Sequence, residues 1–246
     1  MTADRRPSGD PIEVLLLSRQ DLGESDRILR LLTADGVQVS AVARGARASR
    51  RRFGGALEPG TRLWVGLRKG RGDLGWVQSA DVLSSPLRAR SDYGRLLLLG
   101  HGCEVAQALT SEAPEVRIFQ LLGVWLALLE DHAGVGRCAR LAFEAKALTF
   151  VGLCPQLVAC ARCGEPVSGR VHFDADSGGA LHPACGDGVA VDASELAGLE
   201  RLRRTPLRDI CEGPVAGAAA WLLCDFITHH LRRKLSARAM LAEEGL

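Results

Sequence analysis

The first third of the chain is a series of short apolar stretches separated by glycine-containing breaks, a pattern typical of β-strands. Val37, Val39, Ala41 and Ala43 recur at every second position, and the tripeptide before them, residues 34–36 (Ala-Asp-Gly), favours a hairpin turn. The predicted strands cover residues 12–17, 27–33, 37–43, 61–67 and 74–77, with a turn at 21–25. Five short strands with glycine corners predict a small closed barrel of the OB type, and an SH3-like barrel would give a similar pattern.

Beyond Pro86 the spacing of apolar residues becomes that of helices. Leucines at 96–99 belong to the first helix, and Pro114 favours the start of the second because its φ is already helical. A glycine- and cysteine-rich segment, residues 154–191, interrupts this part of the chain. The predicted helices cover residues 92–109, 115–131, 137–151, 194–204, 214–231 and 236–244.

These patterns predict a multi-domain α+β protein: a five-stranded OB-type β-barrel followed by an α-helical domain with a zinc-ribbon-like insertion. A hydrophobic content of 47% with 24% charged residues agrees with folded domains. The expected divisions are a flexible tail at 1–10, an OB-type barrel at 11–84, and a helical domain at 85–246 with its insertion at 154–191.

The insertion contains two pairs of metal-ligand residues at zinc-ribbon spacing. Two residues between the members of each pair let one tight turn direct both side chains at a single ion. Because four protein ligands leave no open position, the site is expected to be structural. The predicted ligands of one Zn²⁺ are Cys160, Cys163, His182 and Cys185. Cys154 and His172 lie nearby and are the other candidates for a ligand position. The alternatives to zinc are a pair of Cys/His turns that has lost its metal and an iron–sulfur cluster.

Residues 171–181, between the two ligand pairs, have the pattern of a hairpin with too few apolar residues to fold alone. A tetrahedral metal would replace the missing core. Gly164 and Gly186 follow the pairs and are expected to give both turns their backbone freedom.

Charge is unevenly distributed along the chain. Its net charge of +2 is the sum of +5 over residues 1–80 and −3 over residues 81–246. Nine basic residues and one acid lie between 44 and 71, with glycines among them. Arginine forks on such backbone suit phosphates, so this segment is predicted to bind nucleic acid; a solvated basic loop without a partner is the alternative. The few barrel aromatics, Phe53, Trp64 and Trp76, allow only limited base stacking.

Other features argue against an exported, membrane-spanning or catalytic chain. Eight cysteines without an export signal indicate thiols in a reducing compartment, and we expect a cytoplasmic, nucleoid-associated protein. There is no phosphate-binding P-loop, no HExxH run and no deaminase motif, so the protein is not expected to be an enzyme. The helical histidines are expected to be packed or exposed and the helical cysteines to be buried thiols: His101, His132, His229, His230, Cys103, Cys138, Cys211 and Cys224.

Three N-terminal motifs resemble the barrel of the bacterial RecO family of recombination mediators. They are Gly23-Glu-Ser-Asp-Arg-Ile28, Ala43-Arg-Gly-Ala-Arg47 and Ser49-Arg-Arg-Arg-Phe-Gly-Gly-Ala-Leu-Glu-Pro59, and the similarity continues to His230-Leu-Arg-Arg-Lys-Leu-Ser-Ala-Arg238. Three positions depart from the family pattern. Arg44 stands where Lys is common, Gly60 where an aromatic residue is frequent, and His182 where zinc-bearing members have Cys.

The resemblance implies a protein that binds single- and double-stranded DNA, anneals complementary strands, and acts with RecR on single-strand-binding protein to help load RecA. The residues predicted to contact DNA phosphates are Arg44, Arg47, Arg50, Arg51, Arg52, Arg68, Lys69 and Arg71.

A C-terminal basic run beside an apolar helix suits the acidic tail of single-strand-binding protein. Its residues are Arg232, Arg233, Lys234 and Arg238. The alternative is that these cations only stabilise the helix by their interaction with the negative end of its dipole. For the whole chain, the alternative function is a zinc-bearing adaptor that binds RNA or protein.

Overall fold

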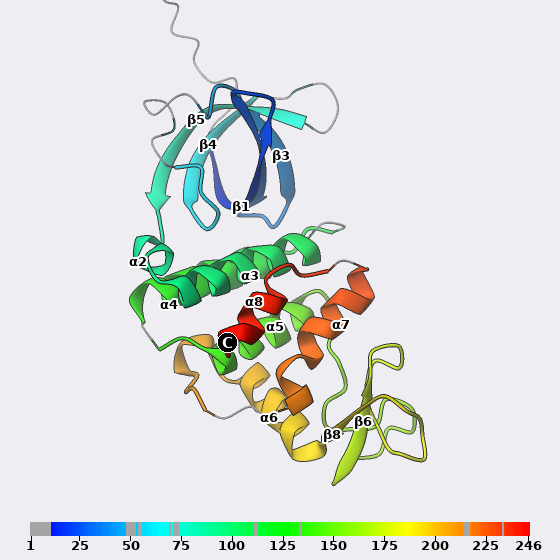
Figure 1. Cartoon of the computed structure of the whole chain (residues 1–246). Coiled ribbons are helices and arrows are strands. Elements are labelled where there is room, and N and C mark those ends of the chain that lie inside the picture. Colours follow the sequence, from blue (N-terminus) through cyan, green and yellow to red (C-terminus); the bar gives the residue numbers. More distant parts are fainter. Residues whose placement is uncertain are drawn as a thin grey trace, which may run out of the picture.

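The computed structural model places a β-barrel at one end, a layer of helices in the middle and a small sheet at the other end (Figure 1). It describes residues 11–47, 53, 56–68, 70, 74–110, 113–132, 134–213, 217–232 and 234–246. The tail predicted at 1–10 therefore lies outside the described residues. None of the described helices is long and apolar enough to cross a membrane.

The predicted five-stranded barrel is confirmed, closed in the order β1-β2-β3-β5-β4. Its strands are β1 (Ile12–Leu22), β2 (Asp26–Thr33), β3 (Gln38–Ala43), β4 (Arg62–Arg68) and β5 (Leu74–Ser84). Pairing is antiparallel except between β3 and β5. Two strands are longer than predicted: β1 continues to Leu22 because Asp21 and Leu22 pair with Arg27 and Asp26, and β5 continues to Ser84 beside β4. The predicted turn is thus shortened to residues 23–25.

Residues 14–17 of strand β1 are buried on both faces, because this part of the strand belongs to two hydrophobic cores. Val14 and Leu16 point into the barrel, whereas Leu15 and Leu17 join the core of the helical layer. The continuous apolar run in this strand reflects this double burial.

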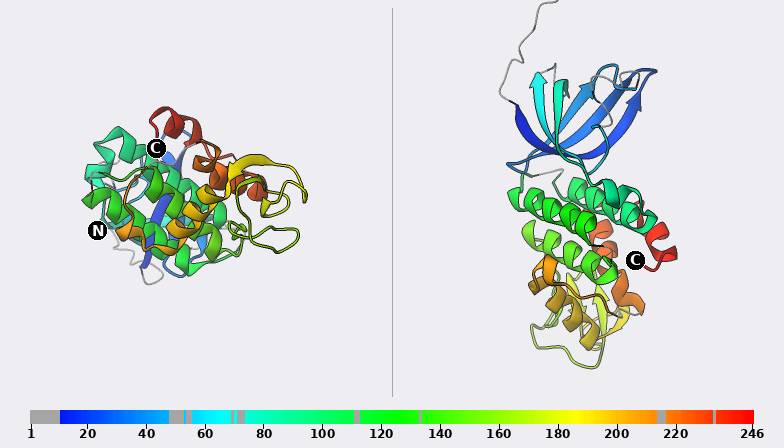
Figure 2. Two further views of the ribbon diagram at one scale, coloured as in Figure 1. Left: turned by 90° about the horizontal axis from the view of Figure 1, so that it is seen from below. Right: turned by 90° about the vertical axis from the view of Figure 1, so that its left-hand side faces the viewer.

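The helical layer consists of α-helices and short 3₁₀ segments. They are α2 (Leu87–Arg90), α3 (Tyr93–Leu109), α4 (Val116–Asp131), α5 (Arg137–Phe150), α6 (Ala193–Arg204), η1 (Leu207–Asp209), η2 (Gly217–Ala220), α7 (Leu222–Leu231) and α8 (Arg238–Glu243). Helices α3 and α4 lie side by side beneath the barrel (Figure 2). The helix predicted at 214–231 is shorter in the structure, since the 3₁₀ turn η2 precedes α7.

The core of the helical layer is built around a buried aromatic pair. Trp125 and Phe143 lie 5.1 Å apart between ring centres, and the indole N–H of Trp125 donates to the carbonyl of Leu98 at 3.1 Å. The aliphatic side chains of α3, α4, α5 and α7 pack around this pair.

A buried ionic group links α3 to α5. Glu144 accepts a hydrogen bond from Arg140 at 2.6 Å, its Oε1 lies 2.7 Å from His101 Nε2, and none of the three side chains is exposed. Arg140 also donates to the carbonyl of Ala220 at 2.6 Å and lies 4.5 Å from the ring centre of Trp221. His101 is therefore a packed residue, as its helical setting predicts.

The insertion folds as a three-stranded sheet of β6 (Arg170–Asp174), β7 (Gly179–Leu181) and β8 (Val189–Asp192), in the order β7-β6-β8. The predicted hairpin is confirmed, and the core that it lacks on its own is supplied by the helical layer. Val171, Phe173 and Ala180 are buried in the core of the helical layer, where Phe173 lies edge-on to Phe226 at 6.0 Å. The hairpin thus takes its core from the helices.

Polar contacts fasten the barrel to the helices at the β2–β3 turn. Gln38 donates to the carbonyl of Gln107 at 2.7 Å and to the Thr110 hydroxyl at 2.9 Å, and Glu115 N–H donates to the carbonyl of Gly36 at 3.2 Å. Gly36 has a φ of +82°, and a Cβ there would lie 2.4 Å from the backbone of Glu115. Only glycine fits this junction without a shift of the backbone.

Candidate nucleic-acid interface and metal centre

The described basic residues of the 44–71 segment that were predicted to bind DNA lie at the end of the barrel away from the helices, called here the distal end. Strand β3 ends at Ala43 and β4 at Arg68, and the register pairs Trp76 with both Val42 and Arg68. Arg44 therefore emerges beside Trp76, and its guanidinium lies 3.9 Å from the centre of the ring. This cation–π contact holds the charged group against a half-buried surface.

Arg47 lies at the distal end too, but the barrel already binds its side chain. It donates to the carbonyl of Gly23 at 2.9 Å and forms a 3.4 Å ion pair with Asp21. Sequence reasoning did not anticipate this use, because its partners precede it by more than 20 residues. The other predicted contacts, Arg50, Arg51, Arg52, Lys69 and Arg71, lie outside the described residues.

Arg62, which belongs to the same basic segment, is turned toward the helices. It pairs with Glu13 and lies 5.6 Å from the ring centre of Phe119 in α4. The basic segment is thus divided between the two ends of the barrel, and only part of its charge can serve the distal end.

The aromatic residues of the barrel have different settings. Phe53 is buried, and Trp64 is exposed with the acidic Glu13 and Asp81 as its cross-strand neighbours. Cross-strand neighbours share a face, so Trp64 stands beside two carboxylates, of which Glu13 is paired with Arg62. Trp76 is the described aromatic side chain that lies with the distal cations.

The end of the Ser49–Pro59 motif is anchored to the body of the protein. Arg19 donates to the carbonyl of Leu57 at 3.2 Å and pairs with Glu58, while Arg90 donates to the carbonyl of Pro59 at 2.8 Å. Burial lowers the pKa of Arg90 from its usual value. This part of the motif therefore serves to hold the chain against Arg19 and Arg90.

Gly60, which follows the motif, packs on the helices. It has a φ of +82°, and a Cβ there would lie 3.1–3.3 Å from Leu126 and Leu99. The aromatic residue frequent in the family would need a different backbone here.

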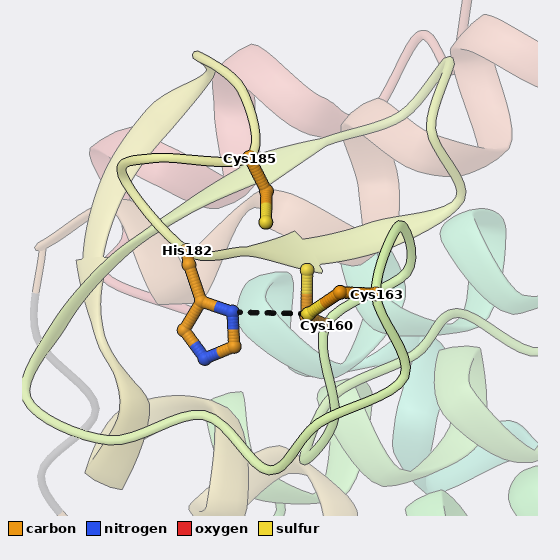
Figure 3. A group of neighbouring side chains, drawn as sticks. All are labelled: Cys160, Cys163, His182 and Cys185. Atoms are coloured by element: carbon orange, nitrogen blue, oxygen red, sulfur yellow. Dashed lines mark hydrogen bonds between the residues drawn. The ribbon is translucent and has the colours of Figure 1, made fainter.

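The predicted metal ligands converge on one point in the insertion (Figure 3). The ligand atoms of Cys160, Cys163, His182 and Cys185 all lie within 4.8 Å of one another, and Cys163 Sγ lies 3.4 Å from His182 Nδ1. Ligands of a tetrahedral zinc lie about 3.8 Å apart, given a Zn–S distance of about 2.3 Å. Within the described part of the chain no other group of this kind occurs.

Tight turns shape both halves of the site. Gly164 N–H donates to the carbonyl of Cys160 at 2.9 Å, and Cys185 N–H donates to that of His182 at 2.8 Å. Gly164 has the predicted positive φ of +80°. Gly186 does not appear among the glycines with positive φ; there a Cβ would lie 3.0 Å from Leu181, so packing and not backbone freedom favours glycine.

The surroundings suit a bound cation. His182 Nε2 lies 3.2 Å from the carbonyl of Pro166, so an N–H there leaves Nδ1 unprotonated and facing the sulfurs. Hydrogen bonds from backbone N–H groups, first that of Cys163, lower the pKa of Cys160 to about 6. Burial, followed by the neighbouring sulfurs, raises the pKa of Cys185 to about 11. A divalent ion would favour the thiolate form of both.

The competing ligands point elsewhere. Cys154 Sγ donates to the carbonyl of Pro155 at 3.8 Å, and His172 Nδ1 lies 2.9 Å from the carbonyl of Gly186. The donor set fits a closed tetrahedral site, so the residues are suited to a structural zinc and leave no position for a substrate.

The C-terminal basic run borders a cavity of about 650 Å³ that Trp221, Leu235 and Lys234 help to line. Arg238 belongs to the same wall, where it forms a 2.8 Å ion pair with Asp225 and lies 5.5 Å from the ring centre of Trp221. Arg232 ends α7 in the left-handed conformation, and Arg233 lies outside the described residues.

Three of the four helical thiols are buried, as predicted. Cys103, Cys138 and Cys224 are buried as predicted, and burial raises the pKa of Cys103 and Cys224 to about 12. Cys211 is exposed, so its predicted burial is wrong. It lies in the segment after η1, where the apolar helical setting expected from the sequence is absent.

Comparisons with known proteins cover nearly the whole chain. Residues 12–86 match the family model Recombination protein O N terminal, and residues 90–239 match Recombination protein O C terminal. Curated relatives named DNA repair protein RecO include that of Anaeromyxobacter dehalogenans strain 2CP-C, 44% identical over 94% of this chain and 95% of the relative. Those of Myxococcus xanthus and Geobacter sulfurreducens are 37% and 35% identical, over 95% and 94% of this chain and 97% and 96% of the relative. The chain belongs to the RecO family of DNA repair proteins.

Proposed function

We propose that this chain is a non-enzymatic recombination mediator that binds single- and double-stranded DNA with the distal end of its barrel and anneals complementary strands. The observation that carries the proposal is the meeting of Arg44, Arg68 and Trp76 at that end, in a chain of the RecO family. Fixed cations neutralise backbone phosphates and release counterions. Two strands in the same positive field repel each other less, so they meet more often.

The proposal includes the partners that family membership suggests. The chain would act with RecR in the cytoplasm, at the nucleoid, on DNA covered by single-strand-binding protein, and would help RecA to assemble there. No covalent step is needed for this work, because exchanging bound proteins on a strand depends on differences in binding free energy alone.

The test is the salt dependence of binding to a labelled oligothymidine. The double variant Arg44→Ala and Arg68→Ala should lower the slope of log K against log salt by about 1–2, given about 0.7 for each phosphate contact on a single strand. Arg208→Ala is the matched control, since this exposed arginine lies in η1, which belongs to the helical layer and not to the barrel. An unchanged slope in the double variant, with a barrel that remains folded, contradicts the proposal.

The basic residues at 50–52 extend the same prediction. Replacing Arg50, Arg51 and Arg52 with alanine should weaken binding to all DNA sequences alike and flatten its salt dependence. A competition between single-stranded DNA and RNA of matched length, run with an annealing assay, separates this function from that of an RNA-binding adaptor.

We also propose that the four-residue cluster of the insertion holds one structural Zn²⁺. Elemental analysis of protein purified without chelators should find one zinc per chain. Cys163→Ser should lose it, whereas His182→Cys should keep it, since four thiolates also bind zinc. Protein that contains no zinc in any preparation contradicts the assignment.

The C-terminal cavity is the proposed site for the acidic tail of single-strand-binding protein. Lys234 and Arg238 supply the charge, and Trp221 with Leu235 supplies an apolar wall. Titration with a labelled tail peptide should saturate, and Lys234→Glu should abolish the saturation by reversing one charge of the wall. If the peptide binds Lys234→Glu and the parent protein equally well, the basic run only stabilises the C-terminal end of the helix dipole.

A further inference from the structure

Two carboxylates lie among the cations of the distal end, on either side of the β1–β2 turn. Asp21 ends the paired part of β1 with Leu22, and Asp26 begins β2. Both reach across to the segment that follows β3, residues 44–47, which carries Arg44 and Arg47. These contacts join parts of the chain that are about 20 residues apart in sequence.

Asp26 fixes the backbone of this segment. Its Oδ1 accepts hydrogen bonds from Gly45 N–H at 2.9 Å and from the Ser25 hydroxyl at 2.8 Å. These hydrogen bonds, first that of Gly45, lower the pKa of Asp26, so the carboxylate is ionised near neutral pH. Gly45 has a φ of +65°. The chain therefore turns sharply directly after Arg44, at a point that the carboxylate holds.

Arg47 provides the second attachment. Its backbone N–H donates to the carbonyl of Ser25 at 2.9 Å, and its side chain contacts the Gly23 carbonyl and Asp21. Asp21 also accepts a hydrogen bond from Arg27 at 3.1 Å, which ties it to β2. The segment that carries the distal cations is thus attached to the β1–β2 turn on both sides of Ala46.

A carboxylate at such a place has two opposite effects on a polyanion. Its charge repels phosphates, so charge alone predicts that its removal strengthens DNA binding. Its hydrogen bond to Gly45 fixes the direction in which Arg44 leaves the sheet and keeps the guanidinium over Trp76. A cation that is already placed loses less conformational entropy when it meets a phosphate.

We propose that Asp26 is a positioning residue for nucleic acid, which strengthens DNA binding despite its negative charge by holding the Arg44–Arg47 segment in its binding conformation. The inference rests on the proposed DNA-binding function. It makes the β1–β2 turn a supporting element of the interface. It also predicts that removal of the Asp26 carboxylate weakens DNA binding, whereas the loss of negative charge alone would strengthen it.

Two substitutions at one position separate the hydrogen bond from the charge. Asp26→Ala and Asp26→Asn both remove the charge, but asparagine keeps a carbonyl oxygen that can accept from Gly45 N–H. In the full chain, Asp26→Ala should bind labelled oligothymidine more weakly than the parent protein does. It should also bind about fivefold more weakly than Asp26→Asn, the effect of one hydrogen bond of typical net strength. Its salt slope should also be smaller by up to about 0.7, because Arg44 no longer makes a full phosphate contact.

Glu24→Ala is the matched control for charge. Glu24 lies in the adjacent β1–β2 turn, is exposed, and makes no side-chain hydrogen bond or ion pair with the described residues. Its removal should leave binding unchanged or strengthen it. Thermal unfolding of each variant identifies any loss of the barrel itself.

The outcomes distinguish this inference from the proposed function. Weaker binding and a smaller salt slope for Asp26→Ala than for Asp26→Asn, with a strengthened or unchanged Glu24→Ala, support it. If the parent protein binds DNA and Asp26→Ala binds as tightly as Asp26→Asn, the positioning role is refuted while the proposed function stands. If the parent protein does not bind DNA at low salt, the proposed function fails, and the inference with it.

Discussion

Replacing Glu144 with glutamine tests how far the helical layer depends on its buried ionic group. The substitution keeps the volume of the side chain and removes its charge. Arg140 then lacks a counter-charge in a place where none of its side chain is exposed. Because nothing else is removed, the change in the free energy of unfolding reports the loss of charge pairing.

The magnitude follows from the contacts that remain. Breaking a buried ion pair by removing one charge costs about 3–5 kcal/mol. Arg140 keeps its hydrogen bond to Ala220 at 2.6 Å and its place over Trp221 at 4.5 Å, which offset part of the loss. We therefore expect a destabilisation of about 3 kcal/mol, at the lower end of that range. The exposed pair of Arg204 with Glu200, at 2.6 Å, is the control, and Arg204→Ala should cost less than about 1 kcal/mol.

The effect of Glu144→Gln also depends on pH. Burial raises the pKa of Glu144, but the combined attraction of Arg140 and His101 outweighs it and holds the pKa below its usual value. A depressed carboxyl pKa contributes stability that is fully present above the unfolded value of about 4.3 and is lost as pH falls through the folded pKa. The difference between the parent protein and Glu144→Gln should therefore be constant near neutral pH and shrink below about pH 4.3.

Urea unfolding provides the assay. Far-UV circular dichroism follows the helices, and tryptophan emission reports on the same layer through Trp125, which is fully buried there. A destabilisation below about 1 kcal/mol at neutral pH, or one that stays constant through the acid range, would refute the reasoning.

Three further predictions concern the metal, the junction and a helix cap. Removing zinc with a chelator should lower the melting temperature of the parent protein and leave that of Cys163→Ser unchanged, as differential scanning calorimetry would show; equal shifts would contradict a structural metal. Gly36→Ala should cost more than about 2 kcal/mol in urea unfolding, because its Cβ would meet the Glu115 backbone at 2.4 Å; a smaller cost would mean that the junction yields. Glu212→Ala should cost about 1 kcal/mol, since Glu212 accepts from Gly136, Cys138 and Ala139 at the start of α5; an unchanged midpoint would show that water replaces the cap.

Local patterns in the sequence were sufficient for the strands and the metal cluster. Alternation and the turn at 34–36 predict the hairpin of β2 and β3, because both are set by neighbouring residues. The convergence of Cys160 with Cys163, and of His182 with Cys185, follows from knuckle geometry in the same way. Only the approach of the two ligand pairs to each other depends on the rest of the fold.

Features that depend on distant contacts were not predictable. The attachment of Arg47 to Asp21 and the burial of Phe173 against α7 need the tertiary arrangement. The hairpin of the insertion has too few apolar residues to fold alone, and its own sequence does not show that the helices complete its core. Similarly, no sequence pattern shows that β1 serves two cores, since burial on both faces appears only as an apolar run.

The small sheet and the distal end of the barrel stand at opposite extremes of the molecule, with the helices between them (Figure 1). Damage at one extreme therefore has no direct route to the other. Oxidation of Cys160, Cys163 and Cys185 would loosen the sheet and its contact with α7 and leave the proposed DNA binding at the distal end unaffected. Changes at the small sheet and changes at the distal end of the barrel should therefore have separate effects, so a partial defect would indicate which of the two regions is altered.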